Sequence, residues 1–307
     1  MNERELIIIG GGPAGLAAGL YAARAKIDVL MLERAMPGGL AANTEFIENY
    51  PGFAEGIDGA ALTARMEAQA KRFGLEITSA DVTGLTYQDG KFAVKTDEQD
   101  LFSHCVILAT GSQPQMLDVP GEEKLRGRGV SYCATCDGAF FRGKEVAVIG
   151  GGDAAVGEAV FLTRFARGVN IIHRRGELRA TKIEQQRAMQ NEKIKFFWFN
   201  TVQEIVGQEE VEGVILKDTR TGATQRMDLN GVFIYVGQKP DSQLVREMAE
   251  LDNNGFIITD DSMRTRQPGL FAAGDVRRKL LRQVVTAVAD GAIAAVAAGK
   301  YLEEIGK

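Results

Sequence analysis

The sequence is poor in cysteine, in histidine and in long apolar runs. Three cysteines in 307 residues cannot make a disulfide scaffold. No run of about 18 or more apolar residues occurs, which predicts that the chain has no membrane span. An excess of positive charge is also missing. The net charge of −5 argues against non-specific binding to nucleic acid or to anionic membranes.

The N-terminus lacks an apolar leader. Its first residues, MNERELIIIGGG, pass from charged side chains directly into a strand-like run without a small-residue cleavage site. We therefore expect a cytoplasmic protein. In that compartment a C-x-x-C indicates redox chemistry or a metal site.

What the sequence does contain is a duplicated glycine-rich segment. ELIIIGGGPAG starts at Glu5, and EVAVIGGGDAA starts at Glu145, 140 residues later. Each segment reads as a β-run, a glycine turn and the start of a helix, continued by helix-like residues 16–26 and 156–167 and then by a second β-run. The pattern predicts an α/β protein with two Rossmann-like dinucleotide-binding units.

The breaks in the pattern predict a discontinuous domain. Residues 59–73 read as an amphipathic helix, residues 86–94 and 101–109 as strands, and the long segment 277–302 as a helix rich in small residues. Breaks at 110–114 and 237–241 then divide the chain. We expect residues 1–113 and 242–307 to form one domain and residues 114–241 an inserted one, so that the two crossings form a hinge.

The first glycine turn has the spacing that a dinucleotide pyrophosphate requires. Gly10 makes the tight turn, Gly12 lets the phosphates approach the backbone, and Gly15 allows the helix to pack closely on the strand. Such a turn can also bind nothing. Glu33, 18 residues beyond Gly15, favours binding because a carboxylate there accepts a hydrogen bond from the ribose 2′-OH.

The second turn differs at the position equivalent to that glutamate. Gly150, Gly152 and Ala155 keep the spacing, but the equivalent of Glu33 is His173, followed by Arg174, Arg175 and Arg179. A basic cluster at a strand end is often only a solvated surface. Here it coincides with the ribose position, and arginine pairs well with phosphate oxygens. The second unit is therefore predicted to bind NADP(H).

The stretch SYCATCDGAFF contains Cys133 and Cys136, and three interpretations compete for it. A structural zinc needs four ligands, but only Cys105, His104 and His173 remain, and the adjacent His104 and Cys105 point to opposite faces of a strand. Two inert thiols are the second interpretation. A redox-active dithiol is favoured because the flanking units supply electrons.

A dithiol that receives electrons from a nicotinamide needs a carrier, and a flavin is the expected one, so the first dinucleotide is predicted to be FAD. Asp137 suits proton transfer to a thiol, although it also starts a D-G turn. Asp275, after a buried strand, suits a flavin hydroxyl. Phe140 and Phe141 could dock a protein substrate, with Arg126 and Arg128 nearby in sequence.

Taken together, the motifs resemble a known family along essentially the whole chain. The order GGGPAG, GGLAANTEFIENYPG, ATGSQP, CATCDGAFF, GGGDAAVGEA, HRRGELRA, FAAGDV and LRQVVTA is similar to that of the bacterial low-molecular-weight thioredoxin reductases. The resemblance implies a homodimer that passes electrons from NADPH through FAD and the Cys133–Cys136 pair to thioredoxin. It also implies domain rotation between the half-reactions.

The resemblance further implies the role of each site residue. Cys136 would face the flavin, Cys133 would attack thioredoxin, and Asp137 would transfer protons. The residues expected to contact FAD are Gly10, Gly12, Pro13, Ala14, Gly15, Glu33, Arg34, Gly38, Gly39, Leu40, Asn43, Asn49, Val82, Ala109, Thr110, Gly111, Gly274, Asp275, Arg282, Gln283 and Val284. Those expected to contact NADPH are Gly150, Gly152, Asp153, Ala155, His173, Arg174, Arg175 and Arg179.

One residue departs from the family pattern. Leu40 stands where the family usually has a glutamine, so a polar contact to FAD is lost there. The sequence alone leaves two other functions open. One is a flavin disulfide reductase of the same fold with another acceptor, such as a peroxiredoxin or a glutaredoxin-like protein. The other is a non-catalytic redox sensor, which would need neither the basic cluster nor two intact glycine turns.

Overall fold

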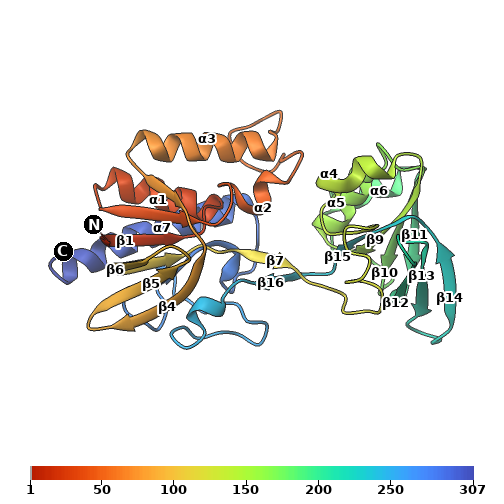
Figure 1. The fold of residues 1–307 in the computed structure, drawn as a ribbon. Helices are drawn as coiled ribbons and strands as arrows, with labels where there is room; N and C mark the ends of the chain where they lie inside the picture. Colours follow the sequence, from red (N-terminus) through yellow and green to blue (C-terminus); the bar gives the residue numbers. More distant parts are fainter. Residues whose placement is uncertain (1) are drawn as a thin grey trace. The chain divides into compact units, whose positions relative to one another are not determined.

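The computed structural model describes residues 2–307 and divides into two compact units. Unit 1 contains the residues through Gln113 together with Lys239–Lys307, and unit 2 contains Pro114–Gln238. The second boundary thus falls three residues before the expected one. In Figure 1, unit 1 is drawn in red to yellow and in blue, and unit 2 mainly in green and cyan.

Unit 1 is built on a seven-stranded sheet in the order β3-β2-β1-β6-β5-β4, with β17 paired to β6. The pairs β1–β2, β1–β6, β2–β3 and β6–β17 are parallel, whereas β4–β5 and β5–β6 are antiparallel. The strands are β1 Glu3–Ile9, β2 Val29–Glu33, β3 Glu76–Ser79, β4 Val82–Gln88, β5 Lys91–Thr96, β6 Asp100–Leu108 and β17 Leu270–Ala272. The helices are α1 Pro13–Arg24, α2 Gly39–Ala42, α3 Gly59–Arg72, η2 Gln243–Val245, η3 Gly274–Val276 and α7 Val284–Glu304.

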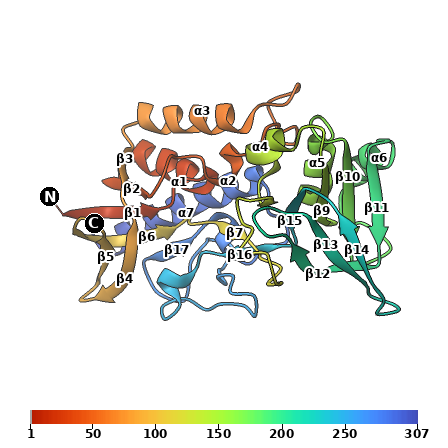
Figure 2. The same ribbon diagram turned by 45° about the vertical axis from the view of Figure 1, so that its right-hand side comes forward.

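Three helices of unit 1 pack in a row. Figures 1 and 2 show α1 between α3 and α7, and α1 contacts both. The close approach of α1 and α7 depends on Gly291, because a Cβ at that position would lie 2.0 Å from the carbonyl oxygen of Ala14. A helix face rich in small residues therefore lets two backbones meet beneath the first glycine turn.

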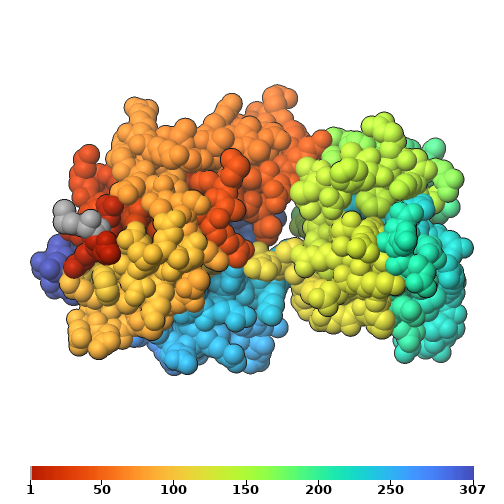
Figure 3. All heavy atoms as spheres, in the orientation of Figure 1, coloured from red at the N-terminus to blue at the C-terminus, as the bar shows by residue number. Residues whose placement is uncertain are grey.

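The strands of unit 1 also form a hydrophobic core together with the segment that contains η2. Leu85, Val94, Leu108 and Val245 belong to this core, which joins β4, β5 and β6 to η2. In Figure 3 the yellow-orange segment that contains β4 and β5 lies beside the light-blue segment that contains η2. The sheet is thus covered on both faces, and its strand ends are held firmly for the loops described below.

Several expected elements differ from those observed. The run 86–94 is not one strand, because Asp89 and Gly90 both take positive φ values and turn the chain between β4 and β5. The helix expected over 277–302 begins only at Val284, where Gln283 and Thr286 form a capping box. The two βαβ helices begin three residues earlier than expected, directly after Gly12 and Gly152.

Unit 2 contains a five-stranded parallel sheet in the order β11-β10-β9-β15-β8 and an antiparallel sheet β12-β13-β14. Its helices α4 and α5 contact each other and share one hydrophobic core with the parallel sheet. The strands are β8 Val130–Ser131, β9 Glu145–Gly150, β10 Gly168–His173, β11 Ile194–Trp198, β12 Asn200–Val206, β13 Gly213–Asp218, β14 Thr224–Asp228 and β15 Gly231–Tyr235. The helices are α4 Ala134–Asp137, η1 Gly138–Phe141, α5 Asp153–Leu162 and α6 Lys182–Met189.

The chain passes between the units twice, and the two passages pair with each other. Strand β7, Ser112–Pro114, and strand β16, Gln238–Pro240, form a two-stranded sheet. On the unit 1 side, Asp241 accepts a hydrogen bond from the Thr110 hydroxyl through its carbonyl (2.6 Å) and donates its N–H to the Gly111 carbonyl (3.1 Å). The passages therefore form a short ladder rather than two loose linkers.

One helix, α7, is long and apolar enough to cross a membrane by length and composition alone. This is weak evidence, because core helices pass the same test. In this protein α7 packs along α1 and carries Asp290, whose carboxylate is paired with two cations.

Candidate functional site: two glycine turns and a disulfide

The first glycine turn has the conformation that its spacing predicts. Gly10 has φ +105°, and a Cβ there would lie 2.5 Å from the Ala109 carbonyl oxygen. A Cβ on Gly15 would lie 1.9 Å from the Gly10 carbonyl oxygen. Gly12 is the N-cap of α1 and has no side chain to satisfy the helix N–H groups. The turn therefore leaves the end of α1 available to an anion.

Glu33 is held against this turn. Its carboxylate accepts hydrogen bonds from the N–H of Gly11 (2.6 Å) and from that of Ala35 (2.9 Å). Gly38 donates its N–H to the Gly11 carbonyl (2.8 Å), and a Cβ on Gly39 would lie 3.2 Å from the Cα of Gly12. The segment expected to contact FAD therefore folds back over the glycine turn, and each Glu33 oxygen keeps one lone pair for a ligand hydroxyl.

The second turn repeats this geometry in unit 2. A Cβ on Gly150 would lie 2.4 Å from the Tyr235 carbonyl oxygen and 2.7 Å from the Ala155 Cβ. Ala155 is buried at this contact, so alanine fits where the first turn has a glycine. Gly152 is the N-cap of α5 and again has no capping side chain. Both βα turns thus leave helix N–H groups to a phosphate.

The basic segment is docked on the second turn. The carbonyl of Gly151 accepts hydrogen bonds from the N–H groups of Arg179 (2.7 Å) and Ala180 (3.1 Å). Asp153, which was expected to contact NADPH, accepts from the N–H of Thr181 (2.6 Å). The side chains of Arg174, Arg175 and Arg179 are exposed. The three arginines thus lie on the segment that follows β10 and packs through its backbone against the second turn.

His173 differs from the three arginines. It is 6 % exposed, its ring lies over Gly151, and its edge faces Trp198 at 6.4 Å between ring centroids. Burial lowers its pKa, with Arg179 and Arg174 acting in the same direction. At pH 7 the imidazole is therefore neutral, and the positive charge available to a phosphate comes from the arginines.

Cys133 and Cys136 form a disulfide in the structure. Cys133 is the N-cap of α4, and its sulfur accepts a hydrogen bond from the Cys136 N–H (3.1 Å). Ser131 holds the other side of Cys133, because its hydroxyl accepts from the Cys133 N–H (3.1 Å) and donates to the Cys133 carbonyl (3.2 Å). Cys136 is exposed and Cys133 half-buried. The pair is a reducible disulfide in a firmly held turn.

The residues after the disulfide divide between surface and core. Asp137, half-buried, ends α4 directly beside Cys136. Phe140 is 75 % exposed, whereas Phe141 is 7 % exposed and packs edge-on against Phe233 at 5.2 Å. Of the two phenylalanines expected to dock a protein, only Phe140 presents its ring to solvent. Phe141 is a core residue.

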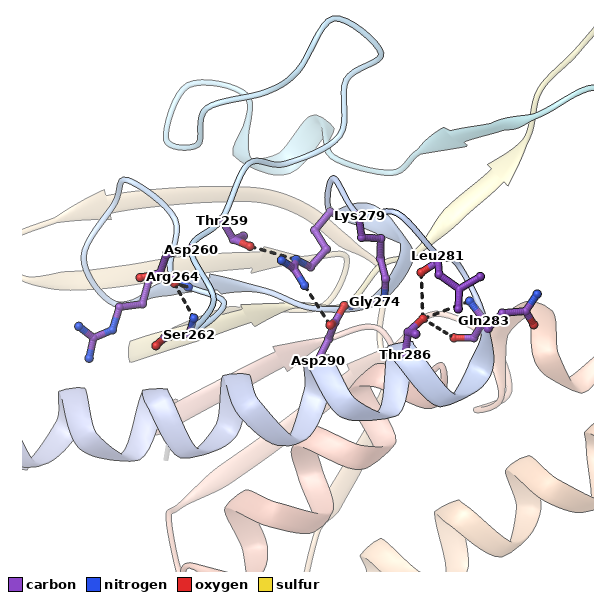
Figure 4. A network of polar contacts seen from close by, with 11 residues as sticks. Thr259, Asp260, Ser262, Arg264, Gly274, Lys279, Leu281, Gln283, Thr286 and Asp290 are labelled. Carbon is purple, nitrogen blue, oxygen red and sulfur yellow. Dashed lines mark hydrogen bonds and ion pairs between the residues drawn. The ribbon is translucent and has the colours of Figure 1, made fainter. Parts of the chain in front are cut away.

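The third part of the expected flavin site is a charged network below the Gly274 turn (Figure 4). Asp290 on α7 accepts hydrogen bonds from Arg277 (2.9 Å), from Lys279 (2.7 Å) and from the N–H of Gly274 (3.1 Å). A Cβ on Gly274 would lie 2.8 Å from that of Ala14. The network therefore fixes the Gly274 turn against the N-terminal end of α1.

We expect Asp290→Asn to destabilise unit 1 by about 3–5 kcal/mol, because it leaves two nearly buried cations without their anion. Urea unfolding followed by circular dichroism measures this loss. The matched control is Asp261→Asn at an exposed aspartate, which should change the unfolding midpoint little. An equal midpoint shift in the two variants would contradict the role of Asp290.

Unpartnered buried atoms test whether cofactors fit here. Asp275 Oδ1, Arg282 Nε and His173 Nε2 are buried and have no hydrogen-bond partner among the described residues. Burial raises the pKa of Asp275, whereas Lys279 and Arg282 lower it. Buried polar atoms normally have partners. Ligand hydroxyl and phosphate groups at the two turns would supply them, so the residues present fit a bound flavin in unit 1 and a nucleotide in unit 2.

The remaining predicted residues lie around these features. Asn49 donates a hydrogen bond to Gln283 (3.1 Å), which joins positions 234 residues apart. Val284 packs against the small core near Tyr50. Leu40 is 48 % exposed on α2, while Arg34 and Asn43 are exposed. Val82 starts β4, two residues after Ala80, whose N–H bonds to the Glu33 carbonyl (3.1 Å).

Several contributors were not predicted from the sequence. They are Ser131 and Tyr235 at the disulfide and Arg277, Lys279 and Asp290 in the network. Asp290 could have been noticed in the sequence, because an acid in the middle of a helix rich in alanine requires a partner when buried. The other contacts join distant segments. Among residues 2–307, no group of three or more His, Cys, Asp or Glu side chains could hold a metal ion.

Comparisons with known proteins agree with this geometry. The pyridine nucleotide-disulphide oxidoreductase family matches residues 4–291. The chain is 49% identical over 304 residues to the thioredoxin reductase of Bacillus subtilis, covering 98% of this chain and 95% of that one.

Two solved structures extend the comparison. The crystal structure of Lactococcus lactis thioredoxin reductase matches with a TM-score of 0.96 at 46% identity, covering 98% of this chain and 99% of that one. The thioredoxin reductase of Streptococcus pyogenes matches with a TM-score of 0.65, also at 46% identity, covering 99% of each chain. At equal identity and similar coverage, those two structures therefore differ from each other in shape.

Proposed function

Because the chain belongs to the pyridine nucleotide-disulphide oxidoreductase family, we propose that it is an NADPH-dependent thioredoxin-disulfide reductase that carries FAD. One observation carries the proposal. A reducible disulfide, Cys133–Cys136, lies in the same unit as a glycine turn flanked by three exposed arginines. Curated relatives at 48–49% identity are thioredoxin reductases.

The reaction moves two electrons from NADPH to a protein disulfide. A bound FAD, held by the first glycine turn and Glu33, would supply the two-electron chemistry that connects the nicotinamide with the Cys133–Cys136 disulfide. The S–S bond breaks, Cys133 and Cys136 become thiols, and Asp137 moves a proton at Cys136. Cys133 then attacks the thioredoxin disulfide, and Cys136 resolves the mixed disulfide, which releases dithiol thioredoxin and restores the pair.

The two turns would hold different dinucleotides. In unit 1, Glu33 would accept from an adenosine 2′-OH, and Asp275 and Gln283 would contact the flavin half of FAD. In unit 2, Arg174, Arg175 and Arg179 would pair with a 2′-phosphate, which only NADPH has. The neutral His173 would donate or accept a hydrogen bond there without contributing charge.

We also propose that the units rotate between half-reactions. The disulfide and the second turn belong to unit 2, and both must reach a flavin held by unit 1. The passages β7 and β16 are paired and short, which suits a hinge. The difference in shape between the two solved relatives supports such a motion in the family.

The direct test is spectroscopic. The purified protein should be yellow, NADPH should bleach the flavin absorbance, and oxidised thioredoxin should restore it with one dithiol formed per NADPH consumed. A colourless protein that does not take up FAD would refute the proposal. Bleaching by NADPH without reoxidation by any thioredoxin would favour a same-fold reductase with another acceptor, such as a peroxiredoxin or a glutaredoxin-like protein.

Phe140 is the side chain that we expect to dock thioredoxin. Phe140→Ala should raise the KM for thioredoxin about tenfold, because an exposed aromatic ring is a typical interface anchor. Reduction of a small aromatic disulfide reagent should stay unchanged. Phe141→Ala is the contrasting variant, because its ring is buried, and it should destabilise the protein by about 3–5 kcal/mol. An unchanged KM in Phe140→Ala would exclude this docking site.

The proposed enzyme is a cytoplasmic homodimer. The α7 side chains Val285, Ile293 and Val296 are exposed and share one face of the helix, which suits a subunit contact. A cytoplasmic location agrees with the cysteine chemistry, because among the described residues the redox pair is the one disulfide and Cys105 is a free thiol.

A further inference from the structure

Tyr235 links the second glycine turn to the disulfide. It ends β15, where it pairs with Gly150 of β9, and its carbonyl oxygen lies against that glycine. Its ring packs on the core shared by α5 and the parallel sheet. Its hydroxyl oxygen accepts a hydrogen bond from the N–H of Ala134 (2.8 Å). One side chain thus spans from the nucleotide turn to the first residue of α4.

The N–H of Ala134 depends on the Tyr235 hydroxyl as its hydrogen-bond acceptor. Ala134 is fully buried, and the neighbouring N–H groups have other acceptors. Cys136 donates to the Cys133 sulfur and Asp137 to the Cys133 carbonyl. Burial raises the pKa of Tyr235, with Glu158 acting in the same direction, so the phenol stays neutral at physiological pH. Removing the hydroxyl would leave a buried donor unpaired.

We propose that Tyr235 is a positioning residue for the redox pair, because it fixes the peptide group that joins Cys133 to Ala134 and so favours the disulfide over the dithiol. Ser131 contacts both peptide groups of Cys133, because its hydroxyl accepts from the Cys133 N–H and donates to the Cys133 carbonyl, whereas Tyr235 accepts from the N–H of Ala134. In the dithiol, α4 is no longer closed by an S–S bond and can rearrange to expose the Ala134 N–H to water. The inference rests on the proposed function only in taking the pair to be redox-active.

The equilibrium with glutathione tests the inference without any cofactor turnover. In the reaction, two glutathione thiols become one glutathione disulfide while the Cys133–Cys136 bond is reduced to two thiols. The full-length FAD-loaded protein is equilibrated at defined glutathione ratios, quenched with acid and alkylated, and the dithiol fraction is read by mass spectrometry. Tyr235→Phe should shift the equilibrium up to about tenfold toward the dithiol, which corresponds to about 30 mV.

Tyr21→Phe is the matched control, because Tyr21 is exposed on α1 in the other unit. Amide hydrogen exchange of Ala134 in the oxidised protein gives a second measurement and should be faster in Tyr235→Phe. An equilibrium constant for Tyr235→Phe within twofold of the Tyr21→Phe value would overturn the proposal, whatever the exchange rate. Failure of the proposed function would appear separately, as wild-type protein that passes no electrons from NADPH to thioredoxin.

Discussion

Replacing either cysteine of the pair with serine should lower NADPH-dependent thioredoxin reduction by about 10³-fold or more, while flavin binding is retained. The reason is that thiol–disulfide exchange needs one thiol to attack and a second to resolve the mixed disulfide. Turnover is measured with thioredoxin coupled to an aromatic disulfide reagent, and bound flavin by its visible absorbance. Residual turnover within tenfold of wild type would contradict the role of the pair.

The two variants also separate the roles of the two sulfurs. Cys136→Ser retains the thiol proposed to attack, so it should accumulate a mixed disulfide with thioredoxin, whereas Cys133→Ser should not. The opposite pattern would exchange the proposed roles. Cys105→Ala is the control. Its thiol is fully buried, and burial raises its pKa to about 12, so its loss should leave turnover within about twofold.

Removing the three exposed arginines should abolish the preference for NADPH over NADH. We expect the triple variant of Arg174, Arg175 and Arg179 to alanine to lose about 10²–10⁴-fold in kcat/KM for NADPH. Each lost hydrogen bond from a charged group costs about 1.5–3 kcal/mol, and at least two would be lost. The kcat/KM for NADH should change by no more than a few fold, because NADH has no 2′-phosphate.

A salt series and a control variant complete this test. In the wild type the KM for NADPH should rise with ionic strength, and in the triple variant this dependence should weaken, since screening acts on the arginine–phosphate pairs. Arg226→Ala removes an exposed arginine on β14 and should leave both cofactor constants unchanged. An equal loss with NADPH and NADH would show that the arginines support the fold of the turn rather than select the phosphate.

The two glycine turns could be predicted from the sequence because close contacts between backbone atoms leave no room for a side chain at these positions. Gly10, Gly15 and Gly150 are needed wherever a strand turns tightly into a helix and backbone atoms nearly touch. The spacing to Glu33 follows from the length of the βαβ unit. Because these requirements fix both residue types and spacings, the motifs alone suffice to identify the family.

The tertiary parts could not be predicted in this way. The Asn49–Gln283 bond joins residues 234 positions apart, and Tyr235 lies 101 positions from Ala134. No local pattern determines such pairs, because they depend on how whole elements pack. The hairpin at Asp89 and Gly90 is a different case, since the Asp-Gly signal was present in the sequence and the strand prediction passed over it.

The paired passages have a consequence for how such a protein can be assembled. Because β7 and β16 pair with each other, the first and last residues of unit 2 are neighbours in space, and the same is true of the two cut ends of unit 1. Genetic exchange could therefore remove or replace residues 114–238 as one cassette, with a short loop closing the gap. The flavin module and its electron-delivering insert are in this sense separately inheritable parts, and chimeras that join a new insert at this ladder would preserve the sheet of unit 1.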